Sequence, residues 1–329
     1  MSKRILVTGA AGFIGSHTAV HLLIRGDSVV GIDNLNSYYS PARKAENLAE
    51  VTAAAHTPSQ FTFVQEDIRD QQALARLFDA HDIDTVVHLA AMAGVRASID
   101  DPHLYYETNL TGTLNLLEAA RTHGVKNFVL ASTSSVYGNT DRMPFEEEDP
   151  CALPIAPYAA SKRAAELLGY TYHHLHKMNF TALRFFTVYG PRGRPDMMAY
   201  KILDNIFFGR EVPLYNGGQM HRDWTYVGDI VAGVVAAADR PLGYELINLG
   251  RGEPVLLADF VTYIEEMTGR PATLVPAPMP DADVLYTYAD ISKARRLLGY
   301  DPKVSVKEGV ERFWHWYEKA VLAQSAHTE

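Results

Sequence analysis

The chain has 329 residues, 47% of them hydrophobic and 21% charged, which is typical of a globular protein long enough to form two lobes. Its formal net charge of −9 argues against nucleic acid as a partner, and its single cysteine, Cys151, excludes an internal disulfide or a metal site of several cysteines. No apolar run is long enough to cross a membrane, so we expect a cytoplasmic protein without a membrane partner.

The start of the chain has the pattern of a strand, a tight turn and a helix. Residues 4–8 predict a buried strand, the run TGAAGFIG occupies 8–15, and apolar residues then recur at helical spacing up to Gly26. A second apolar run over 28–32 ends in Asp33. This order of strand, glycine turn, helix, strand and acid is typical of a dinucleotide-binding unit.

The glycines and the aspartate each have a physical role in such a unit. Gly9 permits the tight turn, Gly12 lets the backbone approach a pyrophosphate, and Gly15 lets the helix pack on the strand. Asp33 is placed to bind both ribose hydroxyls and to repel a 2′-phosphate. The alternative is an ordinary tight turn beside a surface aspartate. The complete unit favours a nucleotide site, with NAD as the cofactor in preference to NADP.

The alternation of strands and helices continues along the chain. Further strands are predicted over 61–64, 85–89, 128–131 and 182–186, and helices over 73–78, 111–120 and 159–168. Right-handed crossovers would wind them into a doubly wound parallel α/β Rossmann sheet. Frequent prolines then break the chain into short elements. We therefore expect an NAD-binding domain over 1–186 and a smaller mixed α/β substrate-binding lobe over 187–329, and the chain can cross between them.

A tyrosine and a lysine one helical turn apart carry the candidate chemistry. Tyr158 and Lys162 follow Pro157 at the start of a predicted helix and lie on one face of it. The lysine ammonium and oxidised nicotinamide would lower the tyrosine pKa from about 10 and favour the phenolate as a base. One hydroxyl of Ser132–Ser135, at a strand end, would complete the site. The set predicts hydride and proton transfer at a carbon that bears a hydroxyl, unless the Tyr-x-x-x-Lys match is chance.

Together these motifs resemble the extended short-chain dehydrogenase/reductase superfamily, and within it the nucleotide-sugar epimerases and dehydratases. The resemblance runs from about residue 3 to residue 317. It implies a catalytic set of Thr133, Tyr158 and Lys162. It also implies cofactor contacts from Gly9, Gly12, Phe13, Ile14, Gly15, Asp33, Asn34, Asp67, Ile68, Leu89, Ala90, Ala91, Asn109 and Lys162, with Asn109 supporting the active-site backbone.

Two serines separate the chain from the dehydratases and decarboxylases that it resembles. The dehydratases follow their catalytic threonine with an Asp-Glu pair, and UDP-glucuronate decarboxylases have Thr-Ser-Glu there, whereas this chain has Ser134 and Ser135. The absence of both carboxylates favours a 4-epimerase. Residues 184–197, 33–36 and 93–96 are similar to UDP-glucuronic acid 4-epimerases, so the resemblance implies interconversion of UDP-glucuronate and UDP-galacturonate through a transient 4-keto sugar.

The same resemblance implies the residues that bind the UDP-sugar. They are Arg96, Ser134, Ser135, Thr187, Arg194, Arg222 and Asp283. The three hydroxyls would hold the sugar carboxylate with Arg194 nearby, because hydroxyl donors suit an anion, and Arg222 would hold the diphosphate. At Arg192 the chain departs from the tryptophan that is common in this family, a change that either alters the pocket or leaves its rim intact.

Three other functions stay open at this point. A UDP-glucose or UDP-N-acetylglucosamine 4-epimerase would use the same machinery with a neutral pocket, and a UDP-glucuronate decarboxylase would release a pentose. A redox-sensing NAD-binding regulator would need only the fold. We expect no bound metal, and the resemblance implies a homodimer that pairs through two helices of each subunit.

Overall fold

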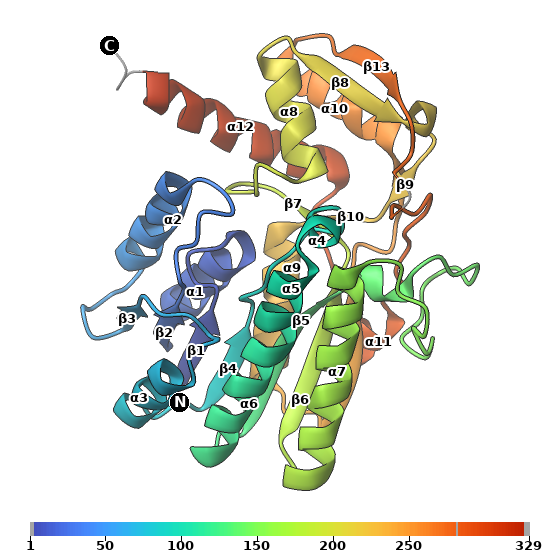
Figure 1. Cartoon of the computed structure of the whole chain (residues 1–329). Coiled ribbons are helices and arrows are strands. Elements are labelled where there is room, and N and C mark those ends of the chain that lie inside the picture. Colours follow the sequence, from blue (N-terminus) through green and yellow to red (C-terminus); the bar gives the residue numbers. More distant parts are fainter. Residues whose placement is uncertain (1–2, 281, 326–329) are drawn as a thin grey trace.

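A seven-stranded parallel sheet forms the larger part of the molecule (Figure 1). The structure is a computed structural model that describes residues 3–280 and 282–325, with side chains up to residue 320. The strands lie in the order β11 (Tyr244–Leu249), β6 (Asn179–Phe185), β5 (Asn127–Thr133), β4 (Thr85–His88), β1 (Arg4–Thr8), β2 (Ser28–Ile32) and β3 (Phe61–Val64). Every neighbouring pair is parallel. The predicted doubly wound α/β Rossmann fold is confirmed.

Helices cover both faces of this sheet, which explains why its central strands are continuous apolar runs. One face carries α1 (Phe13–Arg25), α9 (Val227–Asp239) and α11 (Ser292–Leu298), with α2 (Pro41–Ala53) beside α1. The other face carries α3 (Gln71–Ala80), α6 (Gly112–Thr122) and α7 (Pro157–His176). Short turns connect them: α4 (Ala97–Asp100), α5 (Pro102–Tyr106) and the π-helical η1 (Glu107–Thr111) precede α6, and the 3₁₀ turn η2 (Ser134–Tyr137) follows β5.

A smaller lobe with its own hydrophobic cluster lies over the carboxyl ends of the strands (Figure 1). Its helices are α8 (Met198–Phe207), α10 (Leu257–Thr268) and α12 (Val306–Ser325). Its strand pairs are β8 (Glu211–Tyr215) with β13 (Thr273–Ala277), β7 (Thr187–Tyr189) with β10 (Trp224–Tyr226), and β9 (His221–Arg222) with β12 (Val255–Leu256), and η3 (Asn216–Gly218) follows β8. The stacked rings of Trp224 and Phe260, 3.9 Å apart, lie at its centre.

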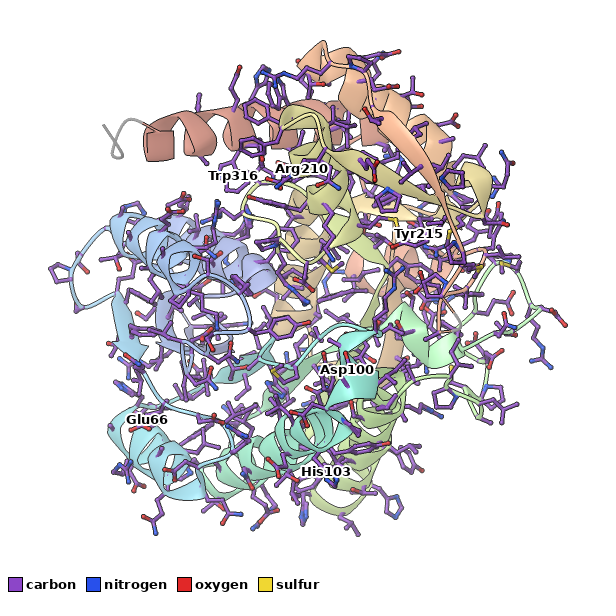
Figure 2. The ribbon with its side chains drawn as sticks, turned by 45° about the horizontal axis from the view of Figure 1, so that its top comes forward. Glu66, Asp100, His103, Arg210, Tyr215 and Trp316 are labelled. Carbon is purple, nitrogen blue, oxygen red and sulfur yellow. The ribbon has the colours of Figure 1, made fainter. Side chains whose placement is uncertain are left out.

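The chain passes between the two parts more than once. Elements α9, β11 and α11 come after residue 187 but join or cover the sheet. The two parts also touch where the Arg43 guanidinium of α2 lies 4.7 Å from the ring centre of Trp316 on α12. Trp316 is labelled in Figure 2. The division into domains at residue 187 stays a prediction. Within residues 3–280 and 282–325, no helix combines the length and the apolar character that spanning a membrane requires.

Candidate active site

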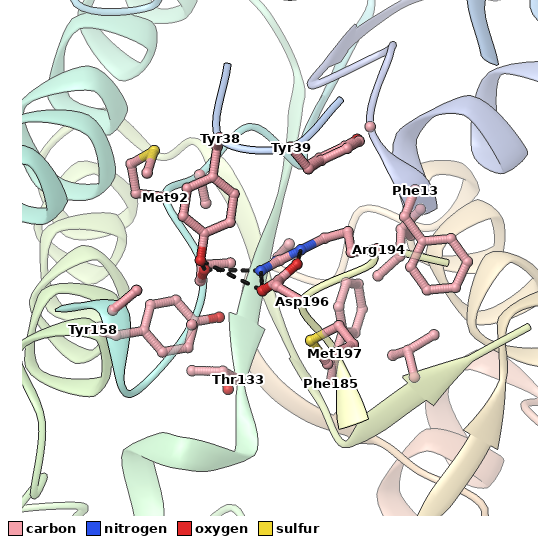
Figure 3. Close-up of a pocket in the computed structure, with 18 of the residues that line it drawn as sticks. Phe13, Tyr38, Tyr39, Met92, Thr133, Tyr158, Phe185, Arg194, Asp196 and Met197 are labelled. Atoms are coloured by element: carbon pink, nitrogen blue, oxygen red, sulfur yellow. Dashed lines mark hydrogen bonds and ion pairs between the residues drawn. The ribbon is translucent and has the colours of Figure 1, made fainter. Parts of the chain in front are cut away.

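A cavity of about 580 Å³ opens at the carboxyl ends of the sheet strands, beneath the smaller lobe (Figure 3). In open parallel sheets this is where ligands bind. Its lining includes every residue predicted for catalysis, for the cofactor or for the substrate, with the exception of Asn109. The fold therefore brings together side chains that are spread over most of the sequence.

The glycine turn between β1 and α1 forms one wall of the cavity. Gly9 has a φ of +70°, a conformation that favours glycine. A Cβ on Gly15 would lie 1.9 Å from the carbonyl oxygen of Gly9, and a Cβ on Gly12 would lie 3.0 Å from the same atom. The turn is therefore too tight for larger residues at these positions. It leads directly into the N-terminus of α1, where free N–H groups favour a phosphate.

Two carboxylates lie beyond the glycine turn, where β2 and β3 end. Asp33 accepts hydrogen bonds from the backbone N–H of Ala11 at 3.2 Å and of Leu35 at 2.8 Å, so its carboxylate is held beside the turn. The side-chain amide of Asn34 donates to Asp67 at 2.8 Å. The residues predicted for the adenosine end of the cofactor thus form one connected group.

Tyr158 and Lys162 lie one turn apart on α7, and Thr133 lies at the end of β5. Burial raises the pKa of Tyr158 above its ordinary value, and the hydrogen bond with Thr133 offsets only part of that rise. Thr133 Oγ1 donates to Ser135 Oγ at 3.1 Å. Figure 3 shows Tyr158 and Thr133 on the same side of the cavity. The hydroxyl groups therefore form a short chain along which a proton can move to or from a bound ligand.

The ammonium group of Lys162 is buried, and it has no hydrogen-bond partner among the residues that the structure describes. Burial lowers the pKa of Lys162 from 10.5 to about 8, while Glu166 opposes that shift. Leaving a buried donor unpaired is costly, so the site is built for a ligand that supplies an acceptor. Ribose hydroxyls are such acceptors. Together with the glycine turn, this orphaned donor fits NAD.

A buried ion pair fixes α7 against the sheet below the predicted catalytic residues. Glu166 and Arg184 are fully buried and form two hydrogen bonds of 3.0 and 2.9 Å. The carboxylate of Glu166 also accepts a bond from Ser132 at 2.6 Å and one from Arg163 at 2.9 Å. Because Ser132 precedes Thr133 and Glu166 lies one turn after Lys162, this cluster sets the distance between β5 and α7, which carry the predicted catalytic residues.

Asn109 supports the site from outside the cavity. The side chain of Asn109 forms two hydrogen bonds of 2.9 Å with the backbone of Met92. Its oxygen accepts from the Met92 N–H, and its amide nitrogen donates to the Met92 carbonyl oxygen. It also donates to Ser161 Oγ, which donates to the carbonyl oxygen of Tyr158 at 2.8 Å. Asn109 lies within the π-helical turn η1. The side chain thus connects the β4 loop to α7.

Hydroxyl groups and one ion pair surround the part of the cavity that is predicted to hold the sugar. Ser134, Ser135 and Thr187 are only partly buried and line it together. Arg194 lies nearby, but its guanidinium forms two hydrogen bonds with Asp196, at 3.0 and 2.5 Å. Figure 3 shows this pair facing Tyr158 and Thr133. None of the described lining residues places a carboxylate beside Thr133 in the two positions that the serines occupy.

Two further arginines line the cavity. Arg96 donates to Asp283 at 2.7 Å and to the hydroxyl of Tyr215 at 3.0 Å, which joins the sheet side to the smaller lobe. Arg222 is buried and donates to the carbonyl oxygen of His221 at 3.0 Å. The neighbouring Asp223 fixes this segment, because its carboxylate accepts four hydrogen bonds from surrounding groups.

Sequence reasoning missed several residues that line the cavity. Tyr38, Lys44, Asp196 and Tyr215 are all part of it. Lys44 lies 3.4 Å from Asp33 and so reduces the charge of the predicted ribose acid. A signal was present for Asp196, because a carboxylate two residues after an arginine can pair with it. Tyr38 and Tyr215 have no such local signal, since only the fold brings them to the site.

Arg192, the position where the chain departs from the family that it resembles, does not line the cavity. Its NH2 group donates to Nδ1 of His17 on α1 at 2.7 Å, and NH1 lies 2.8 Å from Glu50 on α2. Burial and the charge of Arg192 lower the pKa of His17 to about 3, so the ring is neutral and can accept this bond. Through these contacts, Arg192 holds the loop that contains Arg194 against α1 and α2.

No cluster of three or more histidine, cysteine, aspartate or glutamate side chains suited to a metal ion occurs in the part of the chain that the structure describes.

Comparison with known proteins agrees with this geometry. Residues 6–313 match the model of the GDP-mannose 4,6 dehydratase family. The UDP-glucuronate 4-epimerase of Thermodesulfobacterium geofontis is 44% identical over 317 residues, which is 96% of each chain. The crystal structure of UDP-glucuronic acid 4-epimerase from Bacillus cereus, in complex with UDP-glucuronic acid and NAD, superposes with a TM-score of 0.88 at 36% identity and covers 96% of this chain and 99% of that one. The crystal structure of UDP-glucose 4-epimerase from Thermotoga maritima with UDP-glucose superposes with a TM-score of 0.88 at 32% identity. It covers 97% of this chain and 99% of that one.

Proposed function

Because the chain belongs to the GDP-mannose 4,6 dehydratase family, within the extended short-chain dehydrogenase/reductase superfamily, we propose that it is an NAD-dependent UDP-sugar 4-epimerase that interconverts UDP-glucuronate and UDP-galacturonate. One observation favours an epimerase over the dehydratases and decarboxylases of the family. Thr133 and Tyr158 share a cavity with Ser134, Ser135 and Thr187, so hydroxyls stand where a dehydratase or decarboxylase would need a carboxylate.

The proton steps follow from the positions of the catalytic set. Burial disfavours the phenolate of Tyr158 in the NAD-free chain, so the charges of bound NAD and of Lys162 must favour it. As the phenolate, Tyr158 takes the proton from the hydroxyl on sugar carbon 4, and Thr133 bridges the two oxygens. Lys162 stabilises the phenolate with its positive charge and holds the nicotinamide ribose. NAD, when bound, accepts a hydride from carbon 4 and later returns it. The 4-keto sugar stays in the cavity, turns its other face inward and receives its proton back from Tyr158.

The orientation of the sugar carboxylate must be controlled during these reaction steps. The 4-keto form of a uronic acid is a β-keto acid, which loses carbon dioxide when the carboxylate bond stands perpendicular to the carbonyl. Hydroxyl donors from Ser134, Ser135 and Thr187 would hold the carboxylate near the ring plane. These donors are neutral and supply no general acid, so they disfavour the loss of carbon dioxide.

The test is to incubate the purified protein with UDP-glucuronate without added reductant and to resolve the products by proton NMR. UDP-galacturonate alone, in equilibrium with the substrate, supports the proposal. A UDP-pentose would assign the protein to the decarboxylases, and turnover of UDP-glucose or UDP-N-acetylglucosamine without turnover of UDP-glucuronate would assign it to the neutral-sugar epimerases. Tyr158→Phe is the inactive control, and Tyr170→Phe, an exposed tyrosine of the same helix, is its matched partner.

We further propose that the protein acts in the cytoplasm as a homodimer. Large apolar side chains are exposed on two adjacent helices of the sheet face. They are Leu114 on α6 and Leu167, Tyr170 and Leu175 on α7, between 38% and 69% exposed. A patch of this kind supports pairing of α6 and α7 with the same helices of a second subunit.

A further inference from the structure

Arg194 is not available as a free cation at the sugar end of the cavity. Its Nε and NH2 groups donate to the two oxygens of Asp196 at 3.0 and 2.5 Å, and NH2 also donates to the carbonyl oxygen of Ala93 at 2.9 Å. Those two nitrogens carry three N–H groups, and all three are used. A guanidinium can grip a carboxylate with two bonds along either of two edges, and here both edges include NH2, whose hydrogens are already used by Asp196 and Ala93.

Neighbouring groups hold the pair in this arrangement. The ring of Tyr38 lies 5.3 Å from the Arg194 guanidinium, and its hydroxyl donates to Ala93 O at 2.8 Å and lies 3.4 Å from Asp196 Oδ2. Arg192 fastens the same loop to α1 and α2. Figure 3 shows Tyr38, Arg194 and Asp196 together beside the catalytic tyrosine. The neutralised arginine is therefore a built feature of the cavity.

This pairing changes how an anionic sugar is recognised. A positive charge and a negative charge that are bonded to each other present little net charge to a bound carboxylate. Attraction of the sugar carboxylate then falls to the partly buried hydroxyls of Ser134, Ser135 and Thr187. Hydrogen bonds between neutral donors and a carboxylate are weaker than bidentate bonds from a free guanidinium.

We propose that Asp196 is a specificity-determining residue of this site: by keeping Arg194 paired, it limits how tightly the carboxylate of the UDP-sugar is held. The inference rests on the proposed epimerisation of UDP-glucuronate. In that reaction the 4-keto sugar turns over within the cavity, and its carboxylate leaves one set of contacts for another. A moderate hold permits this turn, whereas a bidentate grip by an unpaired arginine would resist it.

The test is a charge series at positions 194 and 196 with NAD present. Binding constants for UDP-glucuronate and UDP-glucose are measured by calorimetry in a Tyr158→Phe background, which prevents turnover. The measured quantity is the ratio of the two constants, so any general damage to the fold cancels. The variants are Asp196→Asn, Arg194→Met and the two combined. Glu308→Gln, which removes an exposed carboxylate paired with Arg312 on α12, is the matched control.

Asp196→Asn is expected to favour UDP-glucuronate over UDP-glucose about tenfold more than the parent protein does, because it frees Arg194. Arg194→Met is expected to shift the ratio about tenfold the other way, since an unpaired Asp196 repels the sugar carboxylate. The combined variant should return to within about threefold of the parent, and Glu308→Gln should match it. With Tyr158 restored, Asp196→Asn should epimerise UDP-glucuronate about tenfold more slowly at saturation.

Equal effects on the two sugars in both single variants would overturn the inference and leave the pair a purely structural feature. So would a weaker hold on UDP-glucuronate in Asp196→Asn. These results are separate from the fate of the proposed function, which fails if the unaltered protein does not convert UDP-glucuronate, whatever the binding ratios show.

Discussion

At the scale of single residues, a buried ammonium without a partner destabilises the folded chain until a ligand accepts its hydrogen bonds. Lys162 is in this position. We therefore expect Lys162→Met to raise the free energy of unfolding of NAD-free protein by about 1–3 kcal/mol and to abolish epimerisation. Urea unfolding measures the first effect. Lys126→Met, at an exposed position, is the control, and a lower stability of Lys162→Met would contradict the role of Lys162 as an unpaired donor.

The same lysine predicts a pH dependence. Its folded pKa of about 8 lies below its ordinary value of 10.5, because burial disfavours the charged form. The folded state therefore bears the full penalty below pH 8, and the penalty disappears as the pH rises from about 8 to 10.5. NAD-free protein should gain stability over this range relative to Lys162→Met, as measured by urea unfolding at several pH values. Parallel curves for the two proteins would show that Lys162 keeps its ordinary pKa.

Thr187 offers a test of the control over the sugar carboxylate. Replacing it with valine keeps the shape of the side chain and removes one donor from the sugar end of the cavity. We expect Thr187→Val to release a UDP-pentose from UDP-glucuronate, because the carboxylate can then leave the ring plane during the 4-keto stage. Proton NMR of the products checks this. If the variant is slower but still forms only UDP-galacturonate, Thr187 does not protect the intermediate.

At the scale of elements, the position of α7 depends on a buried ion pair. Glu166 binds Arg184 on β6 and Ser132 on β5, with no exposed atoms in either charged side chain. Removing one partner leaves an uncompensated buried charge, so Glu166→Gln should lower the free energy of unfolding by about 3–5 kcal/mol. Denaturant unfolding tests this against Glu308→Gln, an exposed pair whose loss should cost no more than about 1 kcal/mol. Similar losses in both variants would contradict the argument.

A hydrogen-bond network links the elements around the site. The hydroxyl of Thr8 accepts the N–H groups of Leu89 and Ala90 and therefore donates to Nδ1 of His88 at 2.7 Å. His88 then donates through Nε2 to Thr113 at 2.9 Å, and burial lowers the pKa of His88 well below its ordinary value, which keeps this ring neutral. The glycine turn, the β4 loop and α6 are thus joined by buried neutral groups.

The sequence predicted the elements with a local pattern. Apolar runs and the glycine turn identified β1, α1 and β2, and the spacing of Tyr158 and Lys162 identified the start of α7. The predicted strand over 182–186 begins earlier, at Asn179, because the buried Phe180 still belongs to the sheet. Residues that meet only in three dimensions could not be paired from sequence. Nothing local links Glu166 to Arg184 or brings Tyr38 to Arg194.

At the scale of the whole molecule, the exposed apolar side chains of α6 and α7 predict subunit pairing. A charge placed on this surface should separate the subunits, because it would be buried without a partner. We expect Leu167→Glu combined with Tyr170→Glu to be a monomer under conditions where the unaltered protein is a dimer. Sedimentation equilibrium measures this, and Leu274→Glu, on the exposed β13 of the smaller lobe, is the control. A monomeric unaltered protein would contradict the pairing.

The late arrival of β11 has a consequence for how the protein is made. The edge of β6, which ends at Phe185, is covered only by β11, which begins at Tyr244. On a ribosome that adds 5–20 residues each second, roughly 3–12 s pass between the synthesis of these strands. During that interval the nascent chain presents an unpaired strand edge, a template to which neighbouring chains can add. The growing polypeptide is therefore most prone to aggregate before β11 has been made.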